Sequence, residues 1–548
     1  MLILEKFIVT SALPYAYSLP HLGNFSGSVL PADVYFKYLE MCGKDAIFIC
    51  GSDQHGTPIE LRAIKEKTTP EKLSNEIHER IRSAYAGLGC AFTFYGKTHT
   101  EENKETVYEI FEALNKNGYI IETHAEHAYC NVDKRFLVDR FIEGTCPYCK
   151  GTKARGDQCD DCGKLLDPIQ LISPHCMICG KSDISFKEVS NLALDLVKLQ
   201  DKIHLFTESS SGRWSKNAAN KSAGSIRDGL RPRDITRNME WGFPVPLKGF
   251  EKNVFYVWFD AVLGYIGITK EWDHSRWRDY WFDKDTKLVQ FMGKDNIEFH
   301  TILWPGILIG SNMGITMPYT IKALEYLTSN TVKFSKSRGV GLNIETALEV
   351  AGSDYWRFAL ISMLPETSDS EFTVELLEES VNKIMNDKIG NLVHRVLTIA
   401  RSNTGKIQFP LKNSYPEIGE LIGKYKSGFE AIKIRDAQKA LIDLAELGNS
   451  LMNSEEPWSL AKAASTDKGK EKRFADSMER MLRIVYSISI MLYPFAPEAS
   501  KKAMGYFGVT VPRIDMLDSE IAINTDSNLT PIFKKLEKEK LDLLRQAN

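Results

Sequence analysis

The sequence predicts an α/β protein in which a parallel sheet is interrupted by a cysteine-rich insertion and followed by an almost entirely helical domain. Three observations predict this class. Continuous apolar strands alternate with helical segments early in the chain. Three C-x-x-C pairs follow between residues 146 and 179, and a nearly unbroken helical pattern begins at Leu377. The length of 548 residues corresponds to three or four domains at roughly 150 residues each.

The first part of the chain supplies the predicted sheet. Lys6 to Ser11 is an apolar strand, a helix is expected from Asn24 to Met41, and Asp45 to Cys50 is a second apolar strand. Pro31 inside the helix predicts a kink or a restart, because proline has no backbone N–H to donate. Buried apolar strands joined by helices of this length are typical of a parallel sheet.

The pattern changes near Gly118, where the cysteine-rich segment begins, and again near Ile235. Strands are then expected at Val254 to Phe259 and at Leu288 to Met292. This order predicts one sheet that is interrupted by an insertion and then completed. The clearest helices expected beyond Leu377 are Lys388 to Arg401, Asp436 to Asn453 and Lys472 to Leu492.

Composition excludes several classes of protein. Hydrophobic residues make up 43% of the chain and charged residues 26%, which rules out a disordered or fibrous chain. The net charge of −3 argues against a protein that coats nucleic acid by bulk charge, although residues from Leu377 onward carry 26 Lys and Arg against 23 Asp and Glu. No apolar stretch reaches the roughly 18 residues of a membrane span, and Glu5 and Lys6 make Met1 to Thr10 a strand and not a signal peptide.

Seven of the ten cysteines fall between Cys130 and Cys179, six of them in C-x-x-C pairs. In a reducing compartment such repeats usually hold a metal, so we expect a cytoplasmic protein with structural zinc. A redox site of the thioredoxin type is a weaker alternative, because it needs one pair and not three. Two pairs separated by nine residues have the spacing of a zinc knuckle: Cys146, Cys149, Cys159 and Cys162.

A second zinc site is a further candidate, and its ligands stay open. Cys130, Cys176 and Cys179 supply three of them. The fourth is His175, His127, Asp133 or water, or the site holds no metal. Both sites are expected to be structural and not catalytic.

The loop after the first strand, Ala12 to Pro20, leads into a helix start that contains His21, Gly23 and Asn24. A strand–loop–helix start favours anions, because unpaired N–H groups and the helix dipole both face the ligand. His21 and Asn24 add side-chain donors, and Gly23 lets a nucleotide approach the backbone. A capping Asn beside a core His explains the same residues about equally well.

Far downstream, residues 333–337 read KFSKS. Lys333 and Lys336 beside two serine hydroxyls suit a triphosphate whose charge rises during displacement at phosphorus. Alone, this motif is more simply a solvated turn. The two motifs are much more specific together, because they stand on either side of an interrupted α/β sheet.

Together the two motifs resemble the HIGH and KMSKS signatures of class I aminoacyl-tRNA synthetases. The resemblance extends to the methionyl-tRNA synthetases in four segments: Ala12 to Tyr15, Cys50 to Pro58 (CGSDQHGTP), Trp258 to Tyr265 (WFDAVLGY) and Gly293 to His300 (GKDNIEFH). The CPYC, CDDC and CMIC pairs resemble the archaeal-type branch, and the resemblance covers essentially the whole chain. Three positions depart from it: Asn24 replaces the second His of HIGH, Val262 stands where the family usually has Pro, and Val132 stands where the branch has a His ligand.

The resemblance implies a Rossmann-like class I catalytic domain with a zinc-knuckle insertion, followed by an α-helical anticodon-binding bundle. The expected boundaries are 1–117 and 236–321 for the two halves of the catalytic domain, 118–235 for the connective insertion, 322–376 for a connector with the KFSKS motif, and 377–548 for the anticodon-binding domain.

The resemblance also implies a two-step reaction. ATP, bound with Mg²⁺, activates methionine to methionyl-adenylate and pyrophosphate, and methionine then moves to the 3′ end of tRNA(Met), including the initiator. A thioether needs polarizable apolar walls, and each sulfur–aromatic contact contributes about 0.3–1.5 kcal/mol. By sequence alone, each aromatic residue assigned to such a wall is equally well explained as a plain core residue. The expected methionine site comprises Leu13, Tyr15, Asp53, Trp258, Ala261, Tyr265 and His300, with Asp53 as the partner of the substrate ammonium.

The expected nucleotide site comprises His21, Gly23, Asn24, Asp295 and Lys336, and the catalytic set is His21, Asn24, Lys333 and Lys336. Positioning and charge stabilisation suffice for this chemistry, so no protein nucleophile is expected. Arg237 matches a family arginine near the active site, although by sequence alone it equally suits a surface salt bridge.

The expected anticodon site comprises Asn391, Arg395, Pro457 and Trp458. Asn391 and Arg395 fall on one helix face, opposite an apolar stripe, and Trp458 offers a ring on which an unpaired base stacks. The alternative is that Trp458 only packs the bundle and Arg395 is only solvated.

Two other functions stay open from the sequence. One is a sibling synthetase for leucine, isoleucine, valine or cysteine. The other is a zinc-bearing tRNA-binding protein whose active site has decayed, against which the intact His21, Asp53, Lys333 and Lys336 argue. A monomer without membrane attachment is expected, since the chain ends near Asn548 without the C-terminal module that dimerises many relatives. The oligomeric state itself, the second zinc site, the effects of Val262 and Asn24 and the tRNA identity elements beyond the anticodon are not decided by sequence.

Overall fold

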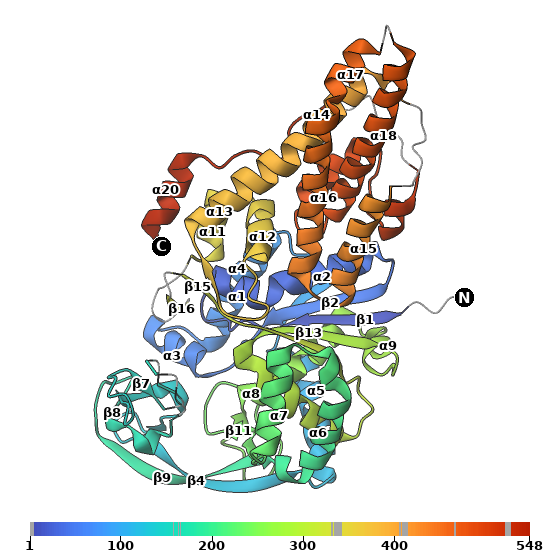
Figure 1. Cartoon of the computed structure of the whole chain (residues 1–548). Helices are drawn as coiled ribbons and strands as arrows, with labels where there is room; N and C mark the ends of the chain where they lie inside the picture. The colour runs from blue at the N-terminus through green and yellow to red at the C-terminus, as the bar shows by residue number, and fades with distance from the viewer. Residues whose placement is uncertain are drawn as a thin grey trace.

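The computed structural model describes residues 5–156, 158–159, 161–162, 164, 166–329, 332–333, 342–404, 407, 415–464, 467–520 and 528–547. Its centre is a five-stranded parallel sheet in the order β14-β13-β1-β2-β3 (Figure 1). The strands are β1 (Lys6–Ser11), β2 (Asp45–Ser52), β3 (Phe94–Lys97), β13 (Lys287–Gly293) and β14 (Pro318–Leu324). The predicted parallel sheet and its first two strands are confirmed, and the strand expected at Leu288 to Met292 lies inside β13.

Helices join the first strands, as the sequence predicts. They are α1 (Leu22–Asn24), α2 (Leu30–Met41), α3 (Thr57–Glu66), α4 (Pro70–Gly87) and α5 (Glu101–Lys116). A wider π-type turn, Phe25–Val29, joins α1 to α2, so the helix restarts just before Pro31. Proline is tolerated at such a start, because its missing N–H would have no partner within the first turn.

The order of the strands creates a switch point between β1 and β13. From β1 the chain builds outward to β2 and β3, and after the insertion it returns to the other side of β1 to build β13 and β14. In parallel sheets of this kind, ligands bind beyond the carboxyl ends of the strands at such a point. The residues that follow β1, β2 and β13 are therefore the ones placed to form a site.

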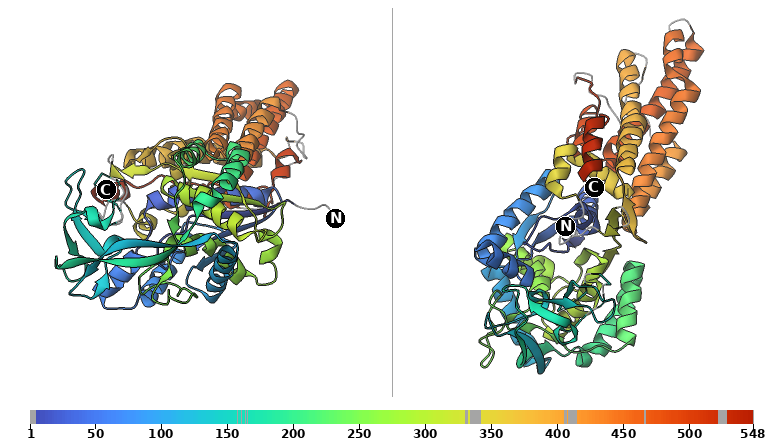
Figure 2. Two further views of the ribbon diagram at one scale, coloured as in Figure 1. Left: turned by 90° about the horizontal axis from the view of Figure 1, so that it is seen from below. Right: turned by 90° about the vertical axis from the view of Figure 1, so that its left-hand side faces the viewer.

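The insertion is a long two-stranded ribbon with a small sheet at its tip (Figures 1 and 2). The ribbon pairs β4 (Ile120–Cys130) with β9 (Ile184–Leu194), and β5 (Arg135–Phe136) and β10 (Arg233–Asp234) add one short strand on each side. The tip sheet consists of β6 (Ile142–Thr145), β7 (Ala154–Arg155) and β8 (Ile172–Cys176). Its buried cluster packs against Leu61 and Ile64 of α3, so the insertion folds back towards the central sheet.

The chain returns to the central domain through short strands and five helices. The strands are β11 (Thr236–Arg237) and β12 (Val254–Phe255), and the helices are α6 (Leu196–Ser210), α7 (Lys216–Arg227), α8 (Val257–Trp272), α9 (Trp277–Trp281) and α10 (Trp304–Ser311). The strand predicted at Val254 to Phe259 is wrong beyond Phe255, because α8 begins at Val257. A short apolar run has the same pattern in a buried strand and a buried helix, and α8 is buried along most of its length.

A connector follows the central sheet. Its three strands, in the order β16-β15-β17, are β15 (Leu327–Ser329), β16 (Val332–Lys333) and β17 (Ser370–Phe372). Its helices are α11 (Ile344–Val350), α12 (Ser353–Ser362) and α13 (Val374–Glu378). Figure 1 shows the connector between the central sheet and the helical domain.

The C-terminal part is helical, as predicted, and rises from the sheet on the side of α2 (Figures 1 and 2). A wider π-type segment, Glu379–Gly390, leads into α14 (Asn391–Ser402). The remaining helices are α15 (Pro416–Glu430), α16 (Ile434–Glu455), α17 (Pro457–Ala463), α18 (Lys468–Met491), α19 (Pro497–Gly505) and α20 (Lys538–Ala547). No helix within the described ranges is long and apolar enough to cross a lipid bilayer.

Candidate functional site

His21 and Asn24 cap each other at the first helical turn after β1. The Nδ1 atom of His21 accepts the backbone N–H of Asn24 at 3.1 Å, and Oδ1 of Asn24 accepts the backbone N–H of His21 at 3.3 Å. Because Nδ1 accepts, the neutral His21 ring carries its proton on Nε2. The two side chains thus form a cap, with His21 as the N-cap residue, but His21 is only partly buried and is not a core residue. The cap is compatible with phosphate binding, since it fixes both side chains at a helix start.

The segment that follows the KFSKS motif lies against the His21 loop. The backbone N–H of Leu22 donates to the carbonyl of Leu342 at 3.0 Å, and His21 pairs with Asn343 in an isolated antiparallel bridge. Lys333 ends β16, but its side chain is not described, and Lys336 lies outside the described residues. The structure thus places Leu342 and Asn343, which follow the second motif in the chain, beside the first motif.

Asp53 lies one residue beyond β2 and is only 3% exposed. It pairs in a parallel bridge with Tyr15, and its Oδ1 atom accepts the backbone N–H of His55 at 3.2 Å. Burial raises the pKa of Asp53 well above its ordinary range, and the nearby carboxylate of Asp260 raises it further. A cationic group placed next to this carboxylate would favour its charged form.

Trp258, Ala261 and Tyr265 lie on one face of α8, since they are three and four residues apart. The hydroxyl of Tyr265 lies 2.9 Å from Nε2 of His300, and Nδ1 of His300 lies 2.9 Å from the carbonyl oxygen of Asn296. Because a carbonyl only accepts, Nδ1 carries the proton and Nε2 accepts from Tyr265. Burial lowers the pKa of His300 to about 4, so this wall is uncharged at neutral pH.

Leu13 lies against α8, and the Trp258 ring on the same helix has two further contacts. A Cβ added at Gly264 on α8 would lie 3.4 Å from Cδ1 of Leu13. The Trp258 ring is edge-on to Phe299 at 4.6 Å between centroids, and the guanidinium of Arg233 lies 4.8 Å from the Trp258 ring centroid. The described contacts therefore join Tyr15 to Asp53, Tyr265 to His300, and Leu13 to α8, the helix that also carries Trp258 and Ala261.

A buried hydrogen-bonded chain lies beside Asp53, and the sequence did not predict it. Nδ1 of His55 contacts Oδ2 of Asp260, and Nε2 of His55 lies 2.8 Å from Nδ1 of His99. The rings of Trp241 and Phe243 pack against both imidazoles. His55 and Asp260 both belong to segments that resemble the synthetases, but no pattern in the sequence shows that they pair.

Asp295 lies on a single 3-10 turn directly after β13, at the switch point of the sheet. The hydroxyl of Tyr326 donates to its Oδ1 atom, and Lys294 forms ion pairs of 2.7 Å with both Glu325 and Asp369. Since Tyr326 directly precedes β15, the start of the connector is held against the residue expected to bind the nucleotide.

Arg237 forms a salt bridge, which is one of the two roles that its sequence context allows. Its Nη1 atom lies 2.7 Å from Oδ2 of Asp234. Its guanidinium also lies 4.3 Å from the ring centroid of Tyr256, the residue that precedes α8. Arg237 thus contacts the start of the helix that lines the expected methionine site.

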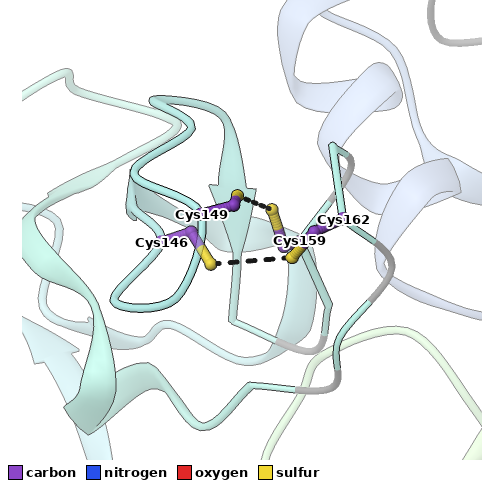
Figure 3. A group of neighbouring side chains, drawn as sticks. All are labelled: Cys146, Cys149, Cys159 and Cys162. Atoms are coloured by element: carbon purple, nitrogen blue, oxygen red, sulfur yellow. Dashed lines mark hydrogen bonds between the residues drawn. The ribbon is translucent and has the colours of Figure 1, made fainter.

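The four cysteines of the first expected zinc site converge at the tip of the insertion (Figure 3). All four Sγ atoms lie within 4.8 Å of one another, with distances of 3.9 Å between Cys146 and Cys162 and 3.6 Å between Cys149 and Cys159. Two thiolates bound tetrahedrally at about 2.3 Å from one zinc ion are roughly 3.8 Å apart. The donor atoms therefore fit zinc.

The second cluster contains Asp133 as its fourth member. Cys130, Asp133, Cys176 and Cys179 bring their ligand atoms within 4.8 Å of one another, whereas His175 lies 3.7 Å from Glu143. Cys130 and Asp133 have the same i, i+3 spacing as the C-x-x-C pairs, so aspartate stands where a second cysteine would complete the pair. That spacing is the sequence signal that favours Asp133 over a histidine or water as the fourth ligand.

The expected anticodon residues gather on the helical domain. Asn391 and Arg395 are exposed on α14, while the opposite stripe is buried: Ile389, Leu392, Val393 and Val396. The guanidinium of Arg395 lies 5.4 Å from the ring centroid of Trp458 at the start of α17. Trp458 is half-buried against the bundle core and Pro457 is buried, so the structure brings Arg395 and Trp458 together at one surface.

Two family models match the chain. Residues 7–397 match the model described as tRNA synthetases class I (M). Residues 406–538 match the model described as the anticodon binding domain of methionyl tRNA ligase. The two matches meet close to the end of α14.

Curated relatives are similar over nearly the whole chain. The methionine–tRNA ligase of Caldivirga maquilingensis is 39% identical, with 98% of this chain and 93% of the relative covered. The methionine–tRNA ligase of Aeropyrum pernix is 39% identical, with 92% and 89% covered. Among solved structures, Mycobacterium tuberculosis methionyl-tRNA synthetase in complex with methionyl-adenylate has the same fold, with a TM-score of 0.79, 21% identity, and 96% of this chain and 99% of that chain covered.

Proposed function

Since the chain belongs to the class I methionine–tRNA ligases, we propose that methionine binds between Asp53 and α8 and that ATP binds at the His21 loop. The protein is a ligase that charges tRNA with methionine. One observation carries the assignment of residues: the segments after β1, β2 and β13 meet at one edge of the sheet, and the segment after the KFSKS motif is bonded to the His21 loop.

The reaction has two displacement steps. A carboxylate oxygen of methionine attacks the α-phosphorus of ATP, and the bond to the bridging oxygen breaks to release pyrophosphate. The terminal ribose hydroxyl of tRNA then attacks the carbonyl carbon of methionyl-adenylate, loses its proton, and releases AMP. The solved relative from M. tuberculosis holds methionyl-adenylate, which supports this order. Both steps depend on positioning and charge stabilisation, so the protein needs no nucleophile.

Methionine is held by charge at one end and by apolar contact at the other. The ammonium group binds the buried carboxylate of Asp53, which the pairing with Tyr15 fixes in place. The thioether contacts Leu13, Trp258, Ala261 and the Tyr265–His300 pair. Because His300 is neutral, it favours an uncharged sulfur over a charged side chain. Val262 is buried at 5% exposure, so the residue that departs from the family packs inward behind this wall.

ATP binds across the switch point. His21, through Nε2–H, and Asn24 donate to phosphate oxygens, and Gly23 lets the nucleotide approach the backbone. Asp295 accepts hydrogen bonds from the ribose hydroxyls, which replace the Tyr326 hydroxyl as its donor. Lys333 and Lys336 neutralise the charge that leaves with pyrophosphate, a role proposed from the sequence. Magnesium arrives as part of the nucleotide complex.

The helical domain reads tRNA(Met), the initiator included, through the anticodon. Arg395 and Asn391 are exposed side by side on α14 and bond the edges of unpaired bases, while the Trp458 ring at the start of α17 stacks on one base. Pro457, buried beneath, fixes the direction of that ring.

The insertion binds two zinc ions. Cys146, Cys149, Cys159 and Cys162 hold one ion, and Cys130, Asp133, Cys176 and Cys179 hold the other. Each of the three C-x-x-C turns has the same backbone bond, from the first cysteine N–H to a carbonyl five residues on: Cys146 to Gly151, Cys159 to Lys164 and Cys176 to Lys181. This repeated turn supports a structural metal, which crosslinks a segment with a small apolar core.

A monomeric enzyme in the cytoplasm fits these features. Zinc bound by seven thiolates requires reduced cysteines, which a reducing compartment maintains. Sedimentation of the purified chain at micromolar concentration checks the monomer, and a dimer would contradict it.

Pyrophosphate exchange across the twenty amino acids tests the proposed function. Methionine should support exchange at least 100-fold better than leucine or cysteine, since the pocket has aromatic walls and a neutral histidine. Asp53→Asn should raise the KM for methionine about 10- to 150-fold, because a charge-assisted bond of roughly 1.5–3 kcal/mol is lost. Asp45→Asn, at the other end of β2 where the carboxylate accepts from Tyr280 at 2.7 Å, is the matched control and should leave KM unchanged.

Three outcomes would overturn the proposal. Equal exchange with leucine would point to a sibling synthetase, and absent exchange in a protein that still binds tRNA would point to a decayed enzyme. An unchanged KM in Asp53→Asn would remove the assigned ammonium partner.

A further inference from the structure

Asp260 is a buried carboxylate that the reaction does not use. Its side chain is inaccessible, its Oδ1 atom has no hydrogen-bond partner among the described residues, and its Oδ2 atom contacts Nδ1 of His55. Asp260 lies in the first turn of α8, one residue before Ala261 of the expected methionine wall. The charge on Asp260 therefore bears directly on the site.

Asp53 and Asp260 interact electrostatically. Both are fully buried, and the Asp260 carboxylate makes ionisation of Asp53 more difficult. Burial raises the pKa of Asp260 well above its ordinary range, and burial lowers the pKa of His55 to about 3. Two buried carboxylates that repel each other do not both ionise easily without a cation. Asp53 accepts hydrogen bonds from the backbone N–H of His55 and from the Thr98 hydroxyl, which favour its charged form, whereas Oδ1 of Asp260 accepts none from the described residues. The proton held before methionine binds is therefore assigned to the Asp260–His55 pair.

A second histidine links this pair to the outside. His55 is 1% exposed, but His99, 2.8 Å away through Nδ1, is half-buried at the start of the loop after β3. Trp241 and Phe243 enclose the two rings, at 4.4 Å between the centroids of His99 and Trp241 and 4.8 Å between those of His55 and Phe243. These two rings hold the imidazoles at hydrogen-bond distance from each other, and His99 is the member of the chain that is nearer to solvent.

We propose that Asp260, His55 and His99 form a proton relay that sets the charge of the methionine ammonium site. This inference rests on the proposed role of Asp53. When the ammonium group of methionine reaches Asp53, the added positive charge offsets the repulsion from the Asp53 carboxylate, so that Asp260 ionises as well. Asp260 then gives up its proton through the two imidazoles to solvent, so that binding of methionine releases a proton.

The transfer conserves every proton. Before methionine binds, the Asp260 carboxyl donates to Nδ1 of His55, Nε2–H of His55 donates to Nδ1 of His99, and His99 carries its proton on Nε2. On release, Nε2 of His99 loses its proton to water, Nδ1 of His99 takes the proton of Nε2 of His55, and Nδ1 of His55 takes the proton of Asp260. The relay ends with an Asp260 carboxylate that accepts from His55.

The charged groups around the relay differ at its two ends. The inner end faces Asp53, whose Oδ1 atom also accepts from the Thr98 hydroxyl at 3.5 Å. The outer end is influenced by Lys97, which disfavours a charged His99, and by Glu71 and Glu101, which favour it. Burial lowers the pKa of His99 to about 4, with His55 as the next cause, so His99 passes the proton on without retaining it at neutral pH.

Titration calorimetry of methionine binding to the full chain tests the proton count. The binding enthalpy is measured at pH 7 in three buffers with different ionisation enthalpies, and its dependence on the buffer gives the number of protons released. We expect about one proton per methionine bound for the wild type, because one carboxyl changes state. Asp260→Asn keeps the shape of the side chain but has no proton to lose, so release should fall close to zero while methionine still binds.

Stopped-flow measurements with a pH indicator test the path. Wild-type release should keep pace with the change in tryptophan fluorescence on binding. His99→Gln removes the outlet but not the titrating carboxyl, so the proton count should persist while release lags binding by at least 10-fold. His78→Gln is the matched control, since His78 bonds Ser52, next to Asp53, at 2.6 Å but does not touch the relay. It should change neither count nor rate.

Each other outcome overturns the relay. If the wild type releases no proton, or if Asp260→Asn still releases a full proton, Asp260 is not the group that titrates. If proton release by His99→Gln is not delayed, His99 is not the outlet of the relay. If Asp260→Asn does not fold, Asp260→Ser takes its place, with the same expected loss, because it also removes the titrating carboxyl. Methionine-dependent pyrophosphate exchange by the wild type is measured separately, so that a failure of the proposed function is distinguished from a failure of the relay.

Discussion

The Arg357 guanidinium on α12 lies 2.6 Å from the Asp33 carboxylate on α2, and both side chains are fully buried. Lys37 is also bonded to Asp33, at 2.5 Å. Nη1 and Nη2 of Arg357 also donate to the carbonyl oxygens of Leu88, after α4, and of Pro494, after α18. One arginine thus ties the central domain, the connector and the helical domain together, which fixes the anticodon residues relative to the sheet.

The first prediction is that Arg357→Leu destabilises the protein by roughly 3–5 kcal/mol, because it leaves buried charge without its partner. Denaturant unfolding of the full chain measures the loss. Arg80→Ala is the matched control, since Arg80 also bridges α4 to the connector, at 2.9 Å from Glu345, but with both side chains exposed. That pair should contribute only about 0–1 kcal/mol. Equal losses in the two variants would show that burial does not decide the strength of these bridges.

The second prediction concerns pH. Burial lowers the pKa of His78 to about 4 from an ordinary 6.5, so the unfolded chain binds a proton between these values that the folded chain does not. The free energy of unfolding should therefore fall as the pH drops from 6.5 towards 4, and be unaffected by this group above 6.5. His78 contributes roughly 1–3 kcal/mol to this loss. His78→Gln should flatten the dependence measured by denaturation at pH 7 and pH 5, and an identical slope in the variant would contradict the assignment.

The sequence predicted three of the five strands of the central sheet, and the helical domain, because their signals are local, while β3 and β14 were not predicted. Continuous apolar runs mark β1, β2 and β13, and the apolar stripe on α14 follows the helical period. The strand predicted at Val254 to Phe259 was partly wrong because it also relied on local signals alone. No local signal separates a buried strand from the buried start of α8.

The candidate site likewise has one part that the sequence predicted and another part that only the tertiary structure reveals. Cysteine spacing alone predicted the first metal cluster, whereas the choice of Asp133 for the second required two segments, 130–133 and 176–179, to be placed in space. His55 and Asp260 are 205 residues apart, and their contact depends on how α8 packs against the end of β2. Pairings of this kind arise from tertiary structure, so a single sequence does not contain a pattern for them.

The third prediction concerns the metal content. The purified protein should contain two zinc ions per chain, and Asp133→Ala should lose one of them, because three thiolates hold zinc more weakly than four ligands. Elemental analysis gives the count. His175→Ala is the control, since His175 lies near the cluster but contacts Glu143, and it should keep both ions. Two ions in Asp133→Ala would mean that aspartate is not a ligand, and a single ion in the wild type would leave the second cluster as a hydrogen-bonded group only.

The last prediction separates recognition of tRNA from activation of methionine. Trp458 is half-buried on α17, and the guanidinium of Arg395 lies 5.4 Å from its ring centroid. A stacked base contributes roughly 1–3 kcal/mol, so Trp458→Ala should lower kcat/KM for tRNA about 5- to 150-fold. Methionine-dependent pyrophosphate exchange without tRNA should stay near wild type, since the central sheet is unchanged.

Leu460→Ala is the control for this last change. Leu460 lies on the same helix and, like Trp458, packs against the bundle core from a half-buried position, but it has no ring on which a base stacks. It should weaken the bundle while leaving charging at low temperature close to wild type. If Leu460→Ala loses charging as severely as Trp458→Ala, or if exchange falls together with charging, then Trp458 acts through packing of the bundle, and the anticodon is read by other residues on α14 and its neighbours.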